Sequence, residues 1–226
     1  MTERPGAALS RRPLHFFLLL DCSGSMGAAG KMNALNTAVG EVLPPLAETS
    51  LANPHVAVTV RAIGFSSGAR WHVETPTAPT DLVWEPLESG GYTDLGAALD
   101  LVATAMTVEA MGERALPPAI VLVSDGMPTD DFASALDRLT ALPWGGRAIR
   151  MAVAIGQDAS YETLTRFIGD PSIEPVTASN PEQLVMALRW ATVHVARAAS
   201  SLAPQGPPPV QIATAWEPGS TQEAVW

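Results

Sequence analysis

At residues 15–25 the sequence reads HFFLLLDCSGS, an apolar run that stops abruptly in polar residues and glycine. A compact apolar run without polar alternation is typical of a strand that is buried on both faces of a sheet. The oxygens of Asp21, Ser23 and Ser25 follow at alternate positions, and Gly24 lets the backbone curl so that they can face one point. We therefore expect a buried strand that leads directly into an oxygen-rich loop.

The chain after this loop alternates between helical and extended patterns. Apolar residues spaced three and four apart predict helices at residues 32–46, 95–106, 132–142, 161–168 and 184–199. Apolar runs, rich in Val and Ile in the second strand, predict strands at 55–65, 119–124, 149–155 and 174–177, with a short antiparallel strand near 70–73. Pro44 and Pro45 should end or kink the first helix. The alternation predicts an α/β fold with a mostly parallel sheet between two layers of helices.

Length and composition are those of one globular domain with tails. The chain has 226 residues, of which 47% are apolar and 16% charged, so a sizeable core can form without disulfides. We expect the domain to span residues 14–199 and residues 1–13 to be a disordered N-terminal segment. Residues 200–226 are interpreted as a Pro-rich C-terminal tail, and Trp216 and Trp226 suggest that it docks on this domain or on a partner.

Charge, cysteine content and the length of the apolar run indicate which partners and which compartment to expect. The net charge of −10 disfavours nucleic acid, because such binding needs basic residues against phosphates. Cys22 is the only cysteine, so no disulfide can form within the chain and nothing indicates an oxidising compartment. The apolar run before Asp21 is too short to span a bilayer, and no small-residue cleavage site follows it. We expect a cytoplasmic protein with no membrane partner.

Two further polar segments should meet the Asp21 loop at one edge of the sheet. They are GGYTD at residues 90–94, which precedes a helix, and Ser124-Asp125-Gly126, which follows a strand. In open α/β sheets, ligands bind in the crevice at the carboxyl ends of the strands. Carboxylates and hydroxyls without His or Cys suit Mg²⁺, Mn²⁺ or Ca²⁺ rather than Zn²⁺ or copper. We predict one divalent cation, with Mg²⁺ favoured, held by five residues that leave a coordination position open: Asp21, Ser23, Ser25, Thr93 and Asp125.

Each segment taken singly also has a purely structural interpretation. Thr93 could cap the helix that follows it, Ser23 and Ser25 could satisfy loop backbone, and Asp125 could be a turn residue. Asp130 and Asp131 lie where a helix begins, so we interpret them as helix caps rather than as extra ligands. The joint occurrence of the three segments, in this order, favours the metal site.

The pattern resembles that of a known family. Residues 21–25, DCSGS, match the DxSxS motif of the metal-ion-dependent adhesion site (MIDAS) of von Willebrand factor A domains. Thr93 matches the isolated Thr of that site and Asp125 its distal Asp, and the resemblance extends over roughly residues 14–199. Residues 18–21, 124–130 and 187–190 are most similar to the TerY branch, which is associated with bacterial tellurium resistance.

The resemblance implies a doubly wound, three-layer fold with a six-stranded sheet whose edge strand is antiparallel. It also implies that a protein partner completes the cation's coordination with a Glu or Asp side chain, and Tyr92 is the aromatic residue we expect at that interface. By analogy with TerY relatives, protein kinases or PP2C-type phosphatases are candidate partners.

Three functions remain open. The first is a non-enzymatic, metal-dependent protein-binding module in an intracellular signalling or stress-response system. The second is a metal-dependent phosphoesterase or phosphotransferase with Asp21 as nucleophile, which is disfavoured because position 23 is Ser rather than a second carboxylate. The phosphate-binding pattern GxxxxGK[ST] does not occur in the sequence. The third is a structural subunit whose site is closed by its own tail through Glu217 or Glu223.

Overall fold

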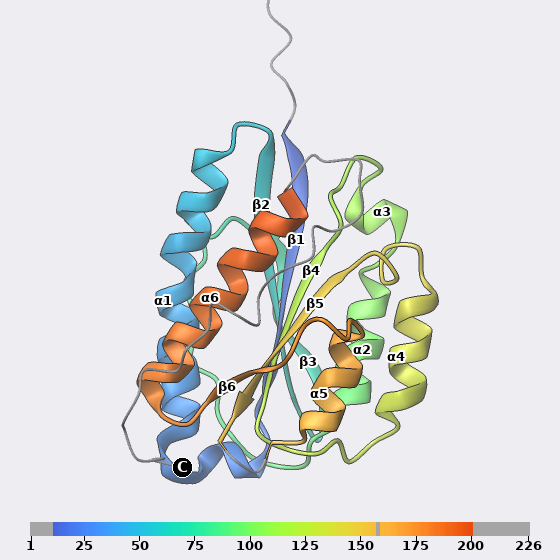
Figure 1. Cartoon of the computed structure of the whole chain (residues 1–226). Helices are drawn as coiled ribbons and strands as arrows, with labels where there is room; N and C mark the ends of the chain where they lie inside the picture. The colour runs from blue at the N-terminus through green and yellow to red at the C-terminus, as the bar shows by residue number, and fades with distance from the viewer. Residues whose placement is uncertain (1–10, 157–158, 201–226) are drawn as a thin grey trace, which may run out of the picture.

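The computed structural model describes residues 11–156 and 159–200 (Figure 1). Its six strands form a single sheet in the order β3-β2-β1-β4-β5-β6. Only β3 is antiparallel to its neighbour, and the other four pairings are parallel, which confirms the predicted fold class. The strands are β1 (Arg12–Asp21), β2 (Val56–Ser66), β3 (Gly68–Thr77), β4 (Ala119–Ser124), β5 (Ile149–Ile155) and β6 (Val176–Ala178).

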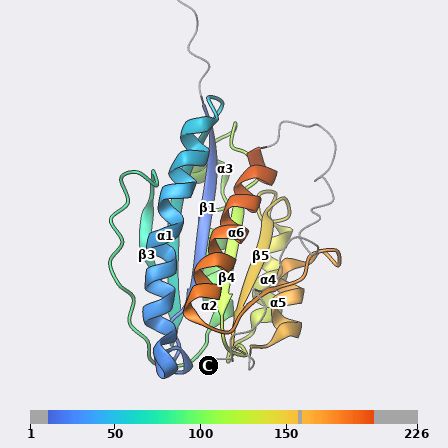
Figure 2. The same cartoon turned by 60° about the vertical axis from the view of Figure 1, so that its left-hand side comes forward.

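Helices cover both faces of the sheet (Figures 1 and 2). Helices α1 and α6 pack together on one face, and α2, α4 and α5 lie on the other. The helical elements are the 3₁₀ segment η1 (Gly24–Gly30), α1 (Lys31–Ala52), α2 (Leu95–Thr104), α3 (Val108–Met111), α4 (Phe132–Ala141), α5 (Tyr161–Ile168) and α6 (Pro181–Ser200). None of the helices in the described part of the chain combines the length and apolarity needed to cross a bilayer.

The buried run of the sequence is the centre of the sheet. Strand β1 lies between β2 and β4, and its residues from Leu14 to Asp21 are all buried. Because both faces of β1 are covered from Leu14 onward, the side chains of this stretch are buried and polar alternation is absent. Asp21 is the last residue of the strand, so the fold carries its carboxylate to the edge where the parallel strands end.

The expected N-terminal boundary at residue 14 is wrong. Strand β1 begins at Arg12, whose backbone N–H donates to the carbonyl of His55 at 2.8 Å. Arg11 contacts Ser50 on α1, so the ordered domain starts before the predicted boundary because residues 11–13 have partners. The rest of the predicted N-terminal segment and the tail beyond Ser200, with Trp216 and Trp226, lie outside the described residues.

Helix α1 does not end at its two prolines. It continues through Pro44 and Pro45 to Ala52, so of the two expected effects, an end or a kink, the prolines do not cause the first. Proline removes the hydrogen bond to the carbonyl four residues earlier, and here Gly40 and Glu41, which carry those carbonyls, are exposed to water. Val42, Leu43 and Leu46 are buried on the other side of the helix. Their packing outweighs the local cost of the prolines.

The remaining predictions are confirmed with small changes at the ends of elements. Strands β4 and β5 and helix α5 have the predicted bounds, whereas β3 is longer and α6 begins at Pro181. The predicted helix at 95–106 ends at Thr104, and the short helix α3 that follows has no counterpart in the sequence patterns. Four residues are too few to show a helical period.

Candidate metal centre

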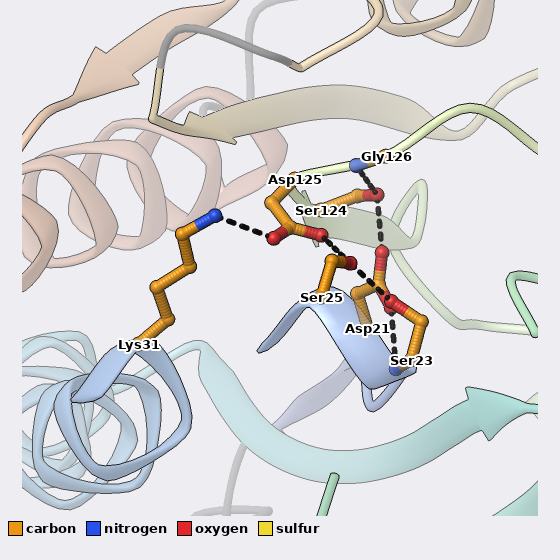
Figure 3. A network of polar contacts seen from close by, with 7 residues as sticks. All are labelled: Asp21, Ser23, Ser25, Lys31, Ser124, Asp125 and Gly126. Carbon is orange, nitrogen blue, oxygen red and sulfur yellow. Dashed lines mark hydrogen bonds and ion pairs between the residues drawn. The ribbon is translucent and has the colours of Figure 1, made fainter. Parts of the chain in front are cut away.

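Asp21 is fixed at the sheet edge by two hydrogen bonds (Figure 3). Its Oδ1 accepts from the backbone N–H of Ser23 at 2.8 Å, and its Oδ2 accepts from Oγ of Ser124 at 2.5 Å. The side chain is buried, so these two donors set the orientation of the carboxylate. Ser124 was not among the predicted site residues. What the sequence shows of Ser124 is that it ends a predicted strand, and in the fold that strand lies next to β1.

The two serines of the loop connect this carboxylate region to Asp125. Oγ of Ser23 lies 3.0 Å from Oγ of Ser25, and Oγ of Ser25 donates to Oδ1 of Asp125 at 2.7 Å. The loop curls because the 3₁₀ segment η1 begins at Gly24, directly after the extended Ser23. The predicted convergence of positions 21, 23 and 25 with position 125 is therefore found in the structure (Figure 3).

The loop before α2 places Thr93 beside both of these segments. Gly24 donates its N–H to the carbonyl of Gly91 at 3.1 Å, and Gly90 donates to the carbonyl of Cys22 at 2.7 Å. On the other side, a Cβ added to Gly126 would lie 3.5 Å from Oγ1 of Thr93. Thr93 is itself buried. All three predicted segments thus meet at one edge of the sheet.

Gly91 is the residue that permits this approach. Its φ is +85°, a region that residues with a side chain rarely adopt. A Cβ at this position would also lie 2.5 Å from Oγ of Ser67. Glycine at position 91 is therefore required by close contact as well as by backbone conformation.

The hydroxyl of Thr93 does not cap α2, although its carbonyl accepts from the N–H of Leu95, the first residue of the helix, at 2.9 Å. The next two N–H groups, of Gly96 and Ala97, donate to the two carboxylate oxygens of Asp130, each at 2.8 Å. Asp131 accepts from the N–H of Ser134 at 3.2 Å and caps α4. Both acidic residues are helix caps, as predicted, but Asp130 caps a helix more than thirty residues earlier in the chain.

Lys31 is a site residue that the sequence patterns did not identify. Its Nζ forms an ion pair with Oδ2 of Asp125 at 2.7 Å, and the two side chains are 10% and 1% exposed. In Figure 3 the lysine extends from the start of α1 toward Asp125. Its partner comes from the end of a distant strand, so the sequence around Lys31 does not indicate the contact.

Burial dominates the electrostatics of Asp21 and Cys22. Loss of solvation raises the pKa of Asp21, whereas the hydrogen bonds from Ser124 and Ser23 oppose that rise and the charge of Asp125 adds to it. Burial also raises the pKa of the Cys22 thiol to about 11. The thiol is therefore protonated near neutral pH and packs in the core as a small apolar group.

The donor set fits a hard cation. Asp21 and Asp125 supply two carboxylates, and the remaining candidate ligands are the hydroxyls of Ser23, Ser25 and Thr93. Among the described residues, His, Cys, Asp and Glu nowhere gather in groups of three or more, so this site depends on hydroxyl oxygens. The ammonium group of Lys31 already places one positive charge on Asp125. Oxygen ligands of this kind suit Mg²⁺, Mn²⁺ or Ca²⁺.

Two exposed side chains flank the centre. Tyr92 precedes Thr93 and is 68% exposed, and Met127 follows the Asp125-Gly126 turn and is 70% exposed. Large apolar side chains that remain in water beside a polar site are typical of contact surfaces. Tyr92 was predicted for such a role, and Met127 was not.

A family model described as von Willebrand factor type A domain matches residues 16–188. None of the curated proteins matches the sequence. Several solved structures are similar in fold. A von Willebrand factor type A protein from Catenulispora acidiphila superposes with a TM-score of 0.63 at 18% identity, covering 82% of this chain and 43% of that one.

Two of the similar structures contain metal. Proximal thread matrix protein 1 from the mussel byssus, with a zinc-occupied MIDAS motif, has a TM-score of 0.62 at 18% identity over 82% of this chain and 48% of its own. Manganese-loaded TRAP protein from Plasmodium vivax has a TM-score of 0.56 at 19% identity over 80% of this chain and 74% of its own. This chain spans less than half the length of the first structures it matches.

Proposed function

Because this chain belongs to the von Willebrand factor type A domain family, we propose that it is a non-enzymatic module that binds a protein partner through a divalent cation. The observation that carries the proposal is the hydroxyl and carboxylate network that runs from Asp21 through Ser23 and Ser25 to Asp125, with Thr93 beside it. Oxygens oriented toward one another in this way at the sheet edge are a donor set that a hard cation can bind.

Each residue has a distinct part in this proposal. The hydroxyls of Ser23, Ser25 and Thr93 hold the ion, and Asp21 and Asp125 bind it directly or through water. An acidic side chain of the partner would complete the coordination of a bound Mg²⁺. Ser124 and the N–H of Ser23 keep the Asp21 carboxylate in place before the ion arrives. With only two charged ligands, we expect a Kd for the cation of about 10⁻⁴ to 10⁻³ M.

The exposed side chains next to the site indicate which chemical groups the partner should carry. Tyr92 and Met127 belong to the two loops that carry Thr93 and Asp125, so they border the open side of the centre. An acidic residue flanked by apolar side chains would match a cation bordered by an aromatic ring and a thioether. The net charge of −10 disfavours nucleic acid as a partner.

The wider setting rests on the sequence resemblance to TerY proteins. We propose a cytoplasmic signalling or stress-response role, with a kinase or a PP2C-type phosphatase as candidate partner. The metal-containing neighbours support the cation, since one carries zinc in its MIDAS motif and another is loaded with manganese. Mg²⁺ is the ion we propose for the native protein, on the basis of its all-oxygen donors.

Titration calorimetry with Mg²⁺ and Mn²⁺ tests the site. We expect measurable binding to the wild type, loss of binding in Asp21→Asn and a clear weakening in Thr93→Ala. Thr104→Ala, which removes an exposed hydroxyl from α2, is the matched control and should bind like the wild type. Identical isotherms for all four proteins would rule out the assigned ligands.

Capture of proteins from the native cell extract tests the partner. The wild type should retain a protein that EDTA releases, and Asp21→Asn and Tyr92→Ala should retain less of it. A chain shortened to residues 1–200 addresses the alternative in which Glu217 or Glu223 closes the site, since these residues lie outside the described part of the chain. Tighter cation or partner binding by the shortened chain would identify the tail as a regulator.

A further inference from the structure

Lys31 places a positive charge inside the candidate metal centre. Its ammonium group lies 2.7 Å from Oδ2 of Asp125, while Oδ1 of the same carboxylate accepts from Ser25. Both partners of the ion pair are nearly excluded from water. One of the two carboxylates proposed for the cation therefore already has a cationic partner supplied by the chain itself (Figure 3).

The local structure around Lys31 is unfavourable without this contact. Lys31 is the first residue of α1, where the positive end of the helix dipole disfavours a cation. Two residues before it lies Ala29, whose φ of +50° makes it the single non-glycine residue with positive φ in the described part of the chain. Strained conformations of this kind persist where the surrounding structure imposes them, and they are concentrated at functional sites. The ion pair with Asp125 is the contact that Lys31 makes in this local geometry.

The choice of lysine at position 31 is also informative. Lys31 is the only lysine in the sequence, and all other residues counted with it as Lys or Arg are arginines. An ammonium group is a compact point charge on a flexible stem, whereas a guanidinium is planar and binds carboxylates in a fixed, bidentate geometry. Lysine can thus occupy a site sized for a small cation and can also leave it.

We propose that Lys31 is a built-in competitor for the divalent cation. In the metal-free protein its ammonium group occupies Asp125 and neutralises part of the buried charge. When a divalent ion binds, repulsion between the two cations and competition for the same carboxylate displace Lys31 from Asp125. Lys31 thereby sets the affinity of the centre and connects its occupancy to the first turn of α1. This inference rests on the proposed metal-binding function.

Calorimetry on two variants of Lys31 tests the competition. Lys31→Met keeps the length of the side chain and removes its charge, so we expect Mg²⁺ and Mn²⁺ to bind on the order of ten- to a hundredfold more tightly, the equivalent of one charge-assisted hydrogen bond. Lys31→Arg keeps the charge in a group that binds carboxylates in a fixed, bidentate geometry, so it should bind the cations no more tightly than the wild type. Asp21→Asn is the control that should not bind.

Labelling of the wild type gives a second readout that does not depend on any variant being folded. As the sole lysine, Lys31 carries the only side-chain amine, and its reaction with an amine-specific reagent can be followed by mass spectrometry. Mn²⁺ or Mg²⁺ should increase its labelling rate, because the displaced ammonium group becomes accessible. The α-amino group of the same chain serves as the internal reference, and Asp21→Asn should show no metal effect.

The outcomes separate this inference from the proposed function. Tighter binding by Lys31→Met, or faster labelling with metal, supports the competition. Unchanged or weaker binding by Lys31→Met, with the wild type still binding and labelling unaffected by metal, overturns it and would assign Lys31 to orienting Asp125 for the ion. Absence of cation binding in the wild type and in Lys31→Met overturns both the competition and the metal centre.

Discussion

The hydroxyl of Ser124, at the end of β4, donates a hydrogen bond of 2.5 Å to Oδ2 of Asp21, at the end of β1, although 103 residues separate them in the chain. The contact exists because β1 and β4 are neighbouring parallel strands with Leu20 paired to Val123, one residue before each partner. Position in the sheet, rather than distance along the chain, therefore determines what holds the candidate metal ligand in place.

Ser124→Ala should weaken cation binding without removing any proposed ligand. A residue that only orients a ligand typically contributes about 10- to 100-fold to metal affinity, and we expect a loss in that range by calorimetry. Ser134→Ala, on α4, is the control for loss of a serine hydroxyl. Wild-type affinity in Ser124→Ala would show that the Asp21 carboxylate is oriented without this contact.

Asp130→Ala should destabilise the fold because it leaves the N–H groups of Gly96 and Ala97, in the first turn of α2, without their acceptor. Loss of a helix cap of this kind costs about 1–2 kcal/mol in the free energy of unfolding, measured by urea denaturation. Asp137→Ala, an exposed aspartate on α4, is the matched control. Equal stability of the two variants would contradict the capping role.

Arg150→Met should be costly, since the guanidinium holds the end of α5 to β5. Its Nε donates to the carbonyl of Phe167 at 2.7 Å and a terminal nitrogen donates to the carbonyl of Gly145 at 3.3 Å. We expect a loss of about 2 kcal/mol in the free energy of unfolding. Arg138→Met, which breaks an exposed ion pair with Asp100, should change stability much less. A larger loss of unfolding free energy in Arg138→Met than in Arg150→Met would contradict this prediction.

His15 should make the folded state less stable in mild acid. Burial lowers its pKa below the ordinary value of 6.5, the hydrogen bond to the Met111 carbonyl opposes this shift, and the charge of Arg61 adds to it. The unfolded chain then takes up a proton before the folded one, so stability is intact above about pH 6.5 and falls as the pH drops toward the lowered pKa. Unfolding free energies of wild type and His15→Gln at about pH 7.5 and 5.5 check this, and a pH-independent difference between them would contradict it.

The Cys22 thiol should be inert in the folded protein. It is 4% exposed and its pKa is raised to about 11, so its thiolate fraction at about pH 8 is roughly a hundredfold lower than that of an ordinary cysteine. A thiol-specific chromogenic reagent should react slowly with the native protein and rapidly after unfolding in denaturant. Rapid reaction of the native protein would show that the end of β1 opens.

The sequence by itself determined the order of the elements and the edge at which the polar loops meet. Apolar spacing is a local property, so it identifies β4, β5 and α5 to the residue and shows that Asp21 and Asp125 follow strands. Since parallel strands end at the same edge of a sheet, the convergence of these loops follows from the chain's own pattern.

Only the tertiary structure decided which partner each polar side chain has. The sequence around Lys31 does not identify Asp125 as its partner, and the sequence around Asp130 does not identify α2 as the helix that it caps. These contacts join segments that only the packing of the chain brings together. The passage of α1 through Pro44 and Pro45 has the same origin, since buried neighbours outweigh the local preference. Periodicity is set by the backbone and can be read along the chain, whereas a hydrogen bond or an ion pair depends on distance in the folded molecule.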